Sequence, residues 1–140
     1  MAITQVNPYI HFNGDAAQAI KHYEAVLGAK VERSMTYGQM PGNTPKDENK
    51  DRVMHCALKL GACTLMLSDA PAEHVGIIGT NVEVSLAYDD EDELRKAFDG
   101  LSKDGQVVFP LHEAFWGGTF GMLVDGFGVH WMFTHERPAK

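Results

Sequence analysis

One order of strands and a helix occurs twice along this chain, and this internal repeat constrains the fold more than any other feature. In the first half, a short apolar segment at residues 9–12 precedes an amphipathic helix that ends near Leu27. In the second half, an apolar segment at residues 82–88 precedes a helix that passes Phe98, which corresponds to Tyr23 seventy-five positions earlier. A repeat of this kind indicates an architecture built from two copies of one unit.

Three strand-like segments follow each helix. They cover residues 30–37, 53–60 and 63–68 in the first half and residues 106–110, 119–124 and 129–134 in the second. Each half therefore reads βαβββ, which predicts the α+β fold class with two tandem modules. We expect one domain over residues 1–140, with a module at about 5–70, a linker at about 70–81 and a second module at about 82–135.

Both helices carry start or stop signals. In the first, Asn13 or Asp15 is expected to accept hydrogen bonds from the free amides of the opening turn, and Gly28 marks the end. In the second, the acidic run at residues 89–93 lies where the helix dipole is positive. This run lacks the glycine-containing spacing of a calcium loop, so we assign it no metal-binding function.

Charge and hydropathy restrict the partners. The net charge of −7 argues against nucleic acids and anionic membranes, because neither attracts an acidic surface. The first residues do not read as an export signal, and no apolar run approaches the ~20 residues of a membrane span. A cytoplasmic protein is therefore expected.

Several segments occur in a familiar order along nearly the whole chain. They are Pro-Tyr-Ile-His-Phe-Asn-Gly at 8–14, Leu-Gly-Ala at 27–29, Tyr-Gly-Gln-Met-Pro at 37–41, Leu-Ser-Asp at 67–69, and the stretch from Phe-Trp-Gly at 115–117 to Trp-Met at 131–132. In this order, and with the βαβββ repeat, the chain resembles the PhnB-like branch of the vicinal oxygen chelate superfamily. That superfamily includes glyoxalase I, extradiol dioxygenases and bleomycin resistance proteins.

The resemblance implies that the strands form an open barrel-like mixed sheet around a central groove. It also implies a homodimer, and a small-molecule ligand in the groove between the modules. Enzymes of the superfamily hold a divalent metal there, through ligands on the first, fourth, fifth and eighth strands. The metal acts as a Lewis acid on substrates with adjacent oxygens.

This chain departs from that ligand pattern. The four positions fall near Pro8, near Met66, on Glu83 and near Met132. Glu83 alone carries a usable carboxylate. A carboxylate inside an apolar strand is expensive to bury unpaired, so Glu83 is expected to have a cation or a hydrogen-bond donor beside it.

Strand alternation offers other groove residues. It places His55 opposite the apolar face of its strand, and His130 on the same face as Met132. For His11 two interpretations stay open. The apolar neighbours of His11 would leave it in the groove with Tyr9, whereas the family register places it on the helix side.

Phe115, Trp116 and Phe120 lie beside two glycines that permit sharp bends. Aromatic side chains at such a loop suit either the wall of a ligand site or a dimer contact, and both interpretations stay open.

Two functions therefore compete. The first is a small-molecule-binding protein of the bleomycin-resistance type, with Tyr9, His11, His55, Phe115, Trp116, Phe120 and His130 as candidate ligand-binding residues. The alternative is a metal-dependent lyase, isomerase or dioxygenase. In this enzyme Glu83, with His55 or His130, would bind a divalent cation and also accept a proton. The cofactor, if any, and the substrate are left open.

Overall fold

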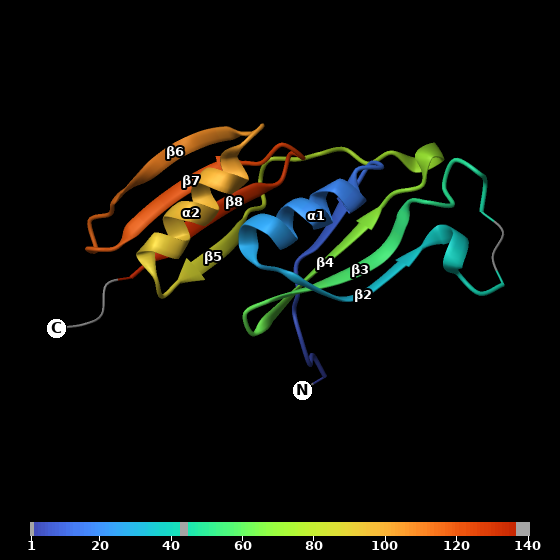
Figure 1. The fold of residues 1–140 in the computed structure, drawn as a ribbon, viewed down its shortest axis with the longest axis horizontal. Coiled ribbons are helices and arrows are strands. Elements are labelled where there is room, and N and C mark those ends of the chain that lie inside the picture. The colour runs from blue at the N-terminus through green and yellow to red at the C-terminus, as the bar shows by residue number, and fades with distance from the viewer. Residues whose placement is uncertain (1, 43–44, 137–140) are drawn as a thin grey trace. The chain divides into compact units, whose positions relative to one another are not determined.

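Each half of the sequence forms a four-stranded mixed sheet with one helix on its face (Figure 1). The computed structural model describes residues 2–42 and 45–136. The chain divides into two units, residues 1–77 and 78–140, which we call the first and the second module. The predicted α+β class and the two tandem βαβββ modules are confirmed, and each module has its own open sheet.

The elements of the first module follow the predicted order. They are β1 (Tyr9–Phe12), α1 (Ala16–Leu27), β2 (Lys30–Thr36), the short 3-10 helix η1 (Tyr37–Gln39), β3 (Val53–Leu60), β4 (Cys63–Asp69) and the 3-10 helix η2 (Ala72–His74). The strand order in the sheet is β1-β4-β3-β2, with β1 parallel to β4 and the other pairs antiparallel. Helix α1 contacts β3 and β4 on one face of this sheet, which leaves the other face without a helix of the module.

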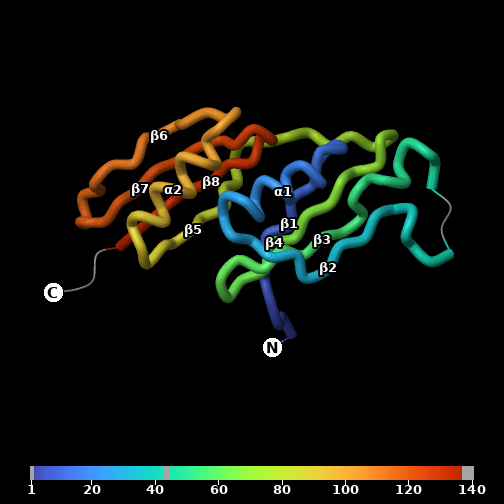
Figure 2. The backbone as a smooth tube through the Cα atoms, viewed as in Figure 1, coloured from blue at the N-terminus to red at the C-terminus, as the bar shows by residue number. Residues whose placement is uncertain are grey.

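The second module repeats this arrangement, as the backbone trace in Figure 2 shows. Its elements are β5 (Val84–Tyr88), α2 (Glu91–Ser102), β6 (Gln106–Glu113), β7 (Thr119–Val124) and β8 (His130–His135). The strand order is β5-β8-β7-β6, with β5 parallel to β8 and the other pairs antiparallel.

Two strand boundaries differ from the prediction by more than one residue. Strand β5 begins at Val84, where its parallel pairing with Trp131 begins, so Glu83 lies just before the strand. Strand β6 continues past Pro110 to Glu113. Because β6 is the edge strand of its sheet, Pro110 can lack an N–H without breaking a ladder on both sides.

The core of each module lies between its helix and its sheet. The buried positions recur at helical spacing, at Ala16, Ala19, Ile20 and Tyr23 in α1 and at Leu94, Ala97, Phe98 and Leu101 in α2. At Gly121 in β7, a Cβ atom would lie only 2.8 Å from the Phe98 ring, so a glycine permits the close packing of α2. No helix among the described residues is long and apolar enough to cross a bilayer.

The helix ends show one correct and one wrong prediction. Gly28 ends α1 in the left-handed conformation, with φ of 68°, as expected. The side chain of Asp15 makes no capping bond, and Asn13 bonds instead to the backbone of Gly76. The opening turn is capped by Asp69 at the end of β4, whose Oδ1 accepts hydrogen bonds from the amides of Gly14 and Ala16. Local spacing could not indicate this cap because Asp69 is distant in sequence.

Candidate ligand-binding site

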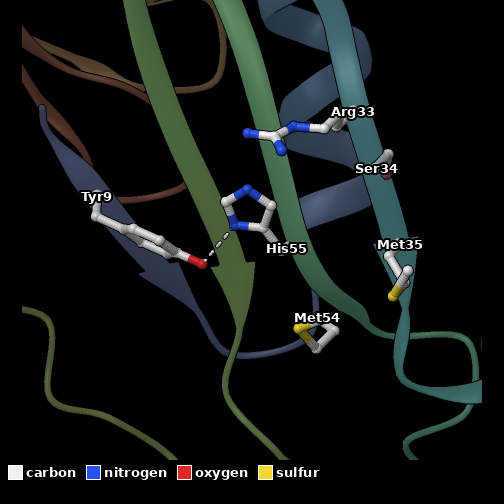
Figure 3. Close-up of a pocket in the computed structure, with 6 residues that line it drawn as sticks. All are labelled: Tyr9, Arg33, Ser34, Met35, Met54 and His55. Atoms are coloured by element: carbon white, nitrogen blue, oxygen red, sulfur yellow. Dashed lines mark hydrogen bonds between the residues drawn. The ribbon is translucent and has the colours of Figure 1, made fainter. Parts of the chain in front are cut away.

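A pocket of about 610 Å³ lies on the first module, where no helix of that module covers the sheet (Figure 3). Its lining combines aromatic, thioether, imidazole and guanidinium groups, from Tyr9, Arg33, Ser34, Met35, Met54 and His55. These residues come from β1, β2 and β3, which are separated in sequence but belong to one sheet.

Strand register explains why these residues meet. A single row crosses the sheet, because Tyr9 pairs with Met66, Met66 with Ala57, and Ala57 with Arg33. Residues in such a row point to the same face of a sheet, so Tyr9 and Arg33 occupy the two ends of one row. The next pair, Met35 with His55, belongs to the same face.

Tyr9 and His55 are joined by a hydrogen bond across strand β4. The Tyr9 hydroxyl lies 2.8 Å from Nδ1 of His55, and the two ring centroids are 5.6 Å apart (Figure 3). Burial raises the pKa of the Tyr9 phenol above its ordinary value, and Ser68 partly offsets the rise. A protonated phenol donates to Nδ1, which leaves the N–H of a neutral imidazole on Nε2.

His11 lies on the same face as this pair. Its ring stacks on Tyr9, with centroids 4.9 Å apart and planes inclined by 16°. The next residue, Phe12, is buried in the core. The structure therefore brings together three of the predicted ligand-binding residues, Tyr9, His11 and His55, on one face of one sheet.

Arg33 adds a positive charge to the pocket. Among the described residues, no carboxylate forms an ion pair with Arg33, whereas Arg95 pairs with Glu91. Met35 and Met54 supply flexible, polarisable walls. The pocket can therefore contact an apolar surface and an anionic group at once.

The sequence did not indicate Arg33, Met35 or Met54 as site residues. Simple alternation would place Arg33 on the same face as Val31. A register shift between these two residues instead pairs Val31 with Leu58 and Arg33 with Ala57. Leu58 is fully buried on the helix side, so the bulge turns Arg33 to the pocket face.

Glu83 and His130 lie in the second module. The Oε2 atom of Glu83 is buried and has no hydrogen-bond partner among the described residues. The parallel register of Val84 with Trp131 places Glu83 beside His130 at the start of the two strands. Trp131 is fully buried, and His130 points to the opposite face because side chains alternate along β8.

The aromatic residues near the β6–β7 turn form a cluster. The Trp116 ring lies 5.1 Å from that of Phe115 and 6.0 Å from that of Phe120, in both cases edge to face. Gly117 has a φ of 93°, which an L side chain rarely adopts. Phe115 is fully exposed and Trp116 is half exposed, so the cluster presents apolar surface.

The donor atoms do not fit the metal site that the resemblance implies. The four expected positions fall near Pro8, near Met66, on Glu83 and near Met132, and of these residues Glu83 alone offers a hard oxygen donor. Among residues 2–42 and 45–136, no three His, Cys, Asp or Glu side chains are grouped to hold a metal ion. The predicted set of Glu83, His55 and His130 combines both modules and stays a prediction.

A family model for the Glyoxalase/Bleomycin resistance protein/Dioxygenase superfamily matches residues 5–133. The chain belongs to this superfamily. Protein YjdN of Escherichia coli strain K12 is 27% identical, over 96% of this chain and 99% of YjdN.

Solved structures share the fold of this chain. Protein PA1353 from Pseudomonas aeruginosa has a TM-score of 0.88 at 34% identity, covering 97% of this chain and 100% of PA1353. The PhnB protein from Bacillus cereus has a TM-score of 0.78 at 23% identity, covering 95% of this chain and 100% of PhnB. At that identity the likeness to PhnB shows a shared fold.

Proposed function

We propose that this chain is a small-molecule-binding protein whose ligand lies in the pocket of the first module and needs no metal. The observation that carries the proposal is the pocket of about 610 Å³ lined by Tyr9, Arg33, Met35 and His55. Drug-sized ligands occupy sites of roughly 300–1,000 Å³ with mostly apolar walls and a few placed polar groups. This pocket has both properties.

The methionines provide a direct test. In methyl-labelled protein, planar apolar compounds should shift the NMR signals of Met35 and Met54, which line the pocket. The signals of Met122 and Met132, in the second module, serve as internal controls. If a broad set of planar compounds at millimolar concentration leaves Met35 and Met54 unmoved, the proposal is wrong.

The finer expectations of the resemblance are separate proposals. A ligand groove between the modules is not required by the first-module pocket.

Association of two copies is supported by the edge strand β6, where Val107, Val108 and Phe109 are 41%, 46% and 52% exposed. Light scattering should then give a mass near twice 15.4 kDa. The aromatic cluster of Phe115, Trp116 and Phe120 keeps both roles, ligand wall and dimer contact.

A second candidate function is catalysis, with Glu83 as a proton acceptor. One observation favours it: the Oε2 atom of Glu83 is buried without a partner in the described structure. A buried unpaired polar atom is costly, and such atoms concentrate at functional sites.

The two candidates can be separated by thermal melts of the native protein and Glu83→Gln with nickel, zinc, manganese and iron(II). A melting shift that the substitution abolishes would support cation binding at Glu83. Equal responses of both proteins would remove Glu83 from any cation site and favour the binding protein.

A further inference from the structure

We infer that the pocket of the first module selects compounds that carry a carboxylate on a planar apolar body, and that Arg33 binds the carboxylate. This inference rests on the proposed function and names the class of ligand that the same pocket takes.

The first argument is the state of the Arg33 charge. Arg33 lines the pocket, and no carboxylate pairs with it in the described part of the chain. Both arginines are exposed, but Arg95 on α2 lies 3.6 Å from Glu91. A guanidinium presents its N–H groups in a planar fork that matches the two oxygens of a carboxylate. The carboxylate of a ligand can therefore pair with the guanidinium of Arg33.

The second argument is which ring nitrogen of His55 accepts a hydrogen bond and which can donate one. Its Nδ1 atom is engaged by the Tyr9 hydroxyl at 2.8 Å. When the phenol donates, the neutral imidazole carries its proton on Nε2, so His55 is a second N–H donor for an anion. Figure 3 shows His55 with one ring nitrogen bonded to Tyr9 and the other turned away from it.

Sheet geometry keeps these two donors within reach of one ligand. Arg33 pairs with Ala57, and His55 precedes Ala57 by two residues on the same face. Diagonal neighbours of this kind lie about 7–8 Å apart at their Cα atoms, a distance that a long arginine side chain spans. Both residues line the same pocket.

The third argument concerns the body of the ligand. Tyr9 stacks on His11 with planes only 16° apart, which gives a flat aromatic surface beside the donors. Met35 and Met54 provide adaptable apolar walls. The chain as a whole carries a net charge of −7, which repels anions in general. Selection of an anion must therefore come from a local cation, and Arg33 supplies it.

The test compares two probes with the same ring system, 2-naphthoate and the neutral 2-naphthamide. Both are titrated into methyl-labelled protein, with the Met35 and Met54 signals as the readout. We expect naphthoate to bind about tenfold more tightly than naphthamide, the size of one charge-assisted hydrogen bond at a partly exposed site. Arg33→Gln should lower the affinity for naphthoate about tenfold, to that for naphthamide, and so remove this preference.

The matched control is Arg95→Gln, which removes the same charge from the second module and should preserve the preference. Arg33→Lys should retain part of it, because lysine keeps the charge and loses the fork. Equal affinity for both probes in the native protein would overturn the inference while leaving the proposed function intact. An Arg33→Gln variant that weakens both probes equally would also overturn it. If neither probe moves the Met35 and Met54 signals although other planar compounds do, the inference is overturned and the proposed function stands. If no planar compound moves these signals, the proposed function fails and this inference with it.

Discussion

The two modules share one topology, yet each is fastened by a buried aspartate in a different place. In the first module, Asp69 is 1% exposed and joins three segments. Its Oδ1 accepts from the amides of Gly14 and Ala16, and its Oδ2 accepts from the amide of Val53. In the second module, Asp125 is 3% exposed and acts within one turn, where it accepts from the amides of Phe127 and Val129.

The difference lies in sequence separation. Asp69 bonds to residues that precede it by 16 to 55 positions, so it fixes the start of α1 to β3 and β4. Three hydrogen bonds to Asp125, from Phe127, Val129 and the Trp131 indole, span only 2 to 6 positions. The second helix instead carries its own cap, because Asp90 accepts from the amide of Glu93. The same fold is therefore held by long-range bonds in one module and by local bonds in the other.

The largest effect is expected from Asp69→Ala. The substitution leaves three backbone amides without their acceptor, two of them in buried bonds. Each buried amide left unpaired costs about 1–3 kcal/mol, so the free energy of unfolding should fall by roughly 3–5 kcal/mol. Urea denaturation monitored by circular dichroism measures the change.

The matched control is Asp90→Ala in the second module. It removes an exposed helix cap and should cost only about 1 kcal/mol. If Asp69→Ala costs no more than Asp90→Ala, the long-range bonds of Asp69 do not hold the first module, and the contrast between the modules fails.

The same contrast explains what the sequence could predict. The Asp90 cap and the Gly28 stop depend on neighbours within one turn, and the helices and strands follow from periodic apolar residues. The role of Asp69 depends on β4 ending beside the first turn of α1, which no local pattern states. Likewise, alternation predicted the face of His55 and left that of His11 open, whereas Arg33 reaches the pocket through a bulge that alternation does not reveal.

An intermediate effect is expected from Asp125→Asn. The asparagine carbonyl can still accept from the amides of Phe127 and Val129. Its NH₂ group would then face the N–H of Trp131, which loses its acceptor while fully buried. One unpaired buried donor should cost about 2 kcal/mol. Urea denaturation gives the loss, and Trp131 fluorescence reports whether the indole changes its surroundings. A variant as stable as the native protein would show that this bond does not fasten the turn.

The smallest effect concerns two tyrosines in different surroundings, one in a pocket and one packed against the core. Tyr9 lies on the pocket face of the first module and has His55 as a hydrogen-bond partner. Tyr88 of the second module stacks on the fully buried Phe133, with ring centroids 5.9 Å apart. Burial and, to a lesser degree, the charge of Glu93 raise the pKa of Tyr88 from 10.0 to about 12.

A raised pKa in the folded state has a defined consequence for stability. The folded protein holds the Tyr88 proton more tightly than the unfolded chain, so this contribution is complete below pH 10 and is lost between pH 10 and about 12. Tyr88→Phe cannot ionise and should therefore lose less stability than the native protein between pH 8 and 11, by under about 1 kcal/mol after solvent screening. Urea denaturation at both pH values measures the difference.

Tyr9→Phe is the matched variant. It should change the loss of stability at alkaline pH less than Tyr88→Phe does, because Tyr9 is more exposed than Tyr88. If Tyr88→Phe and the native protein lose stability in parallel, the Tyr88 phenol is not shielded as its packing on Phe133 implies, and the two modules do not differ in this respect.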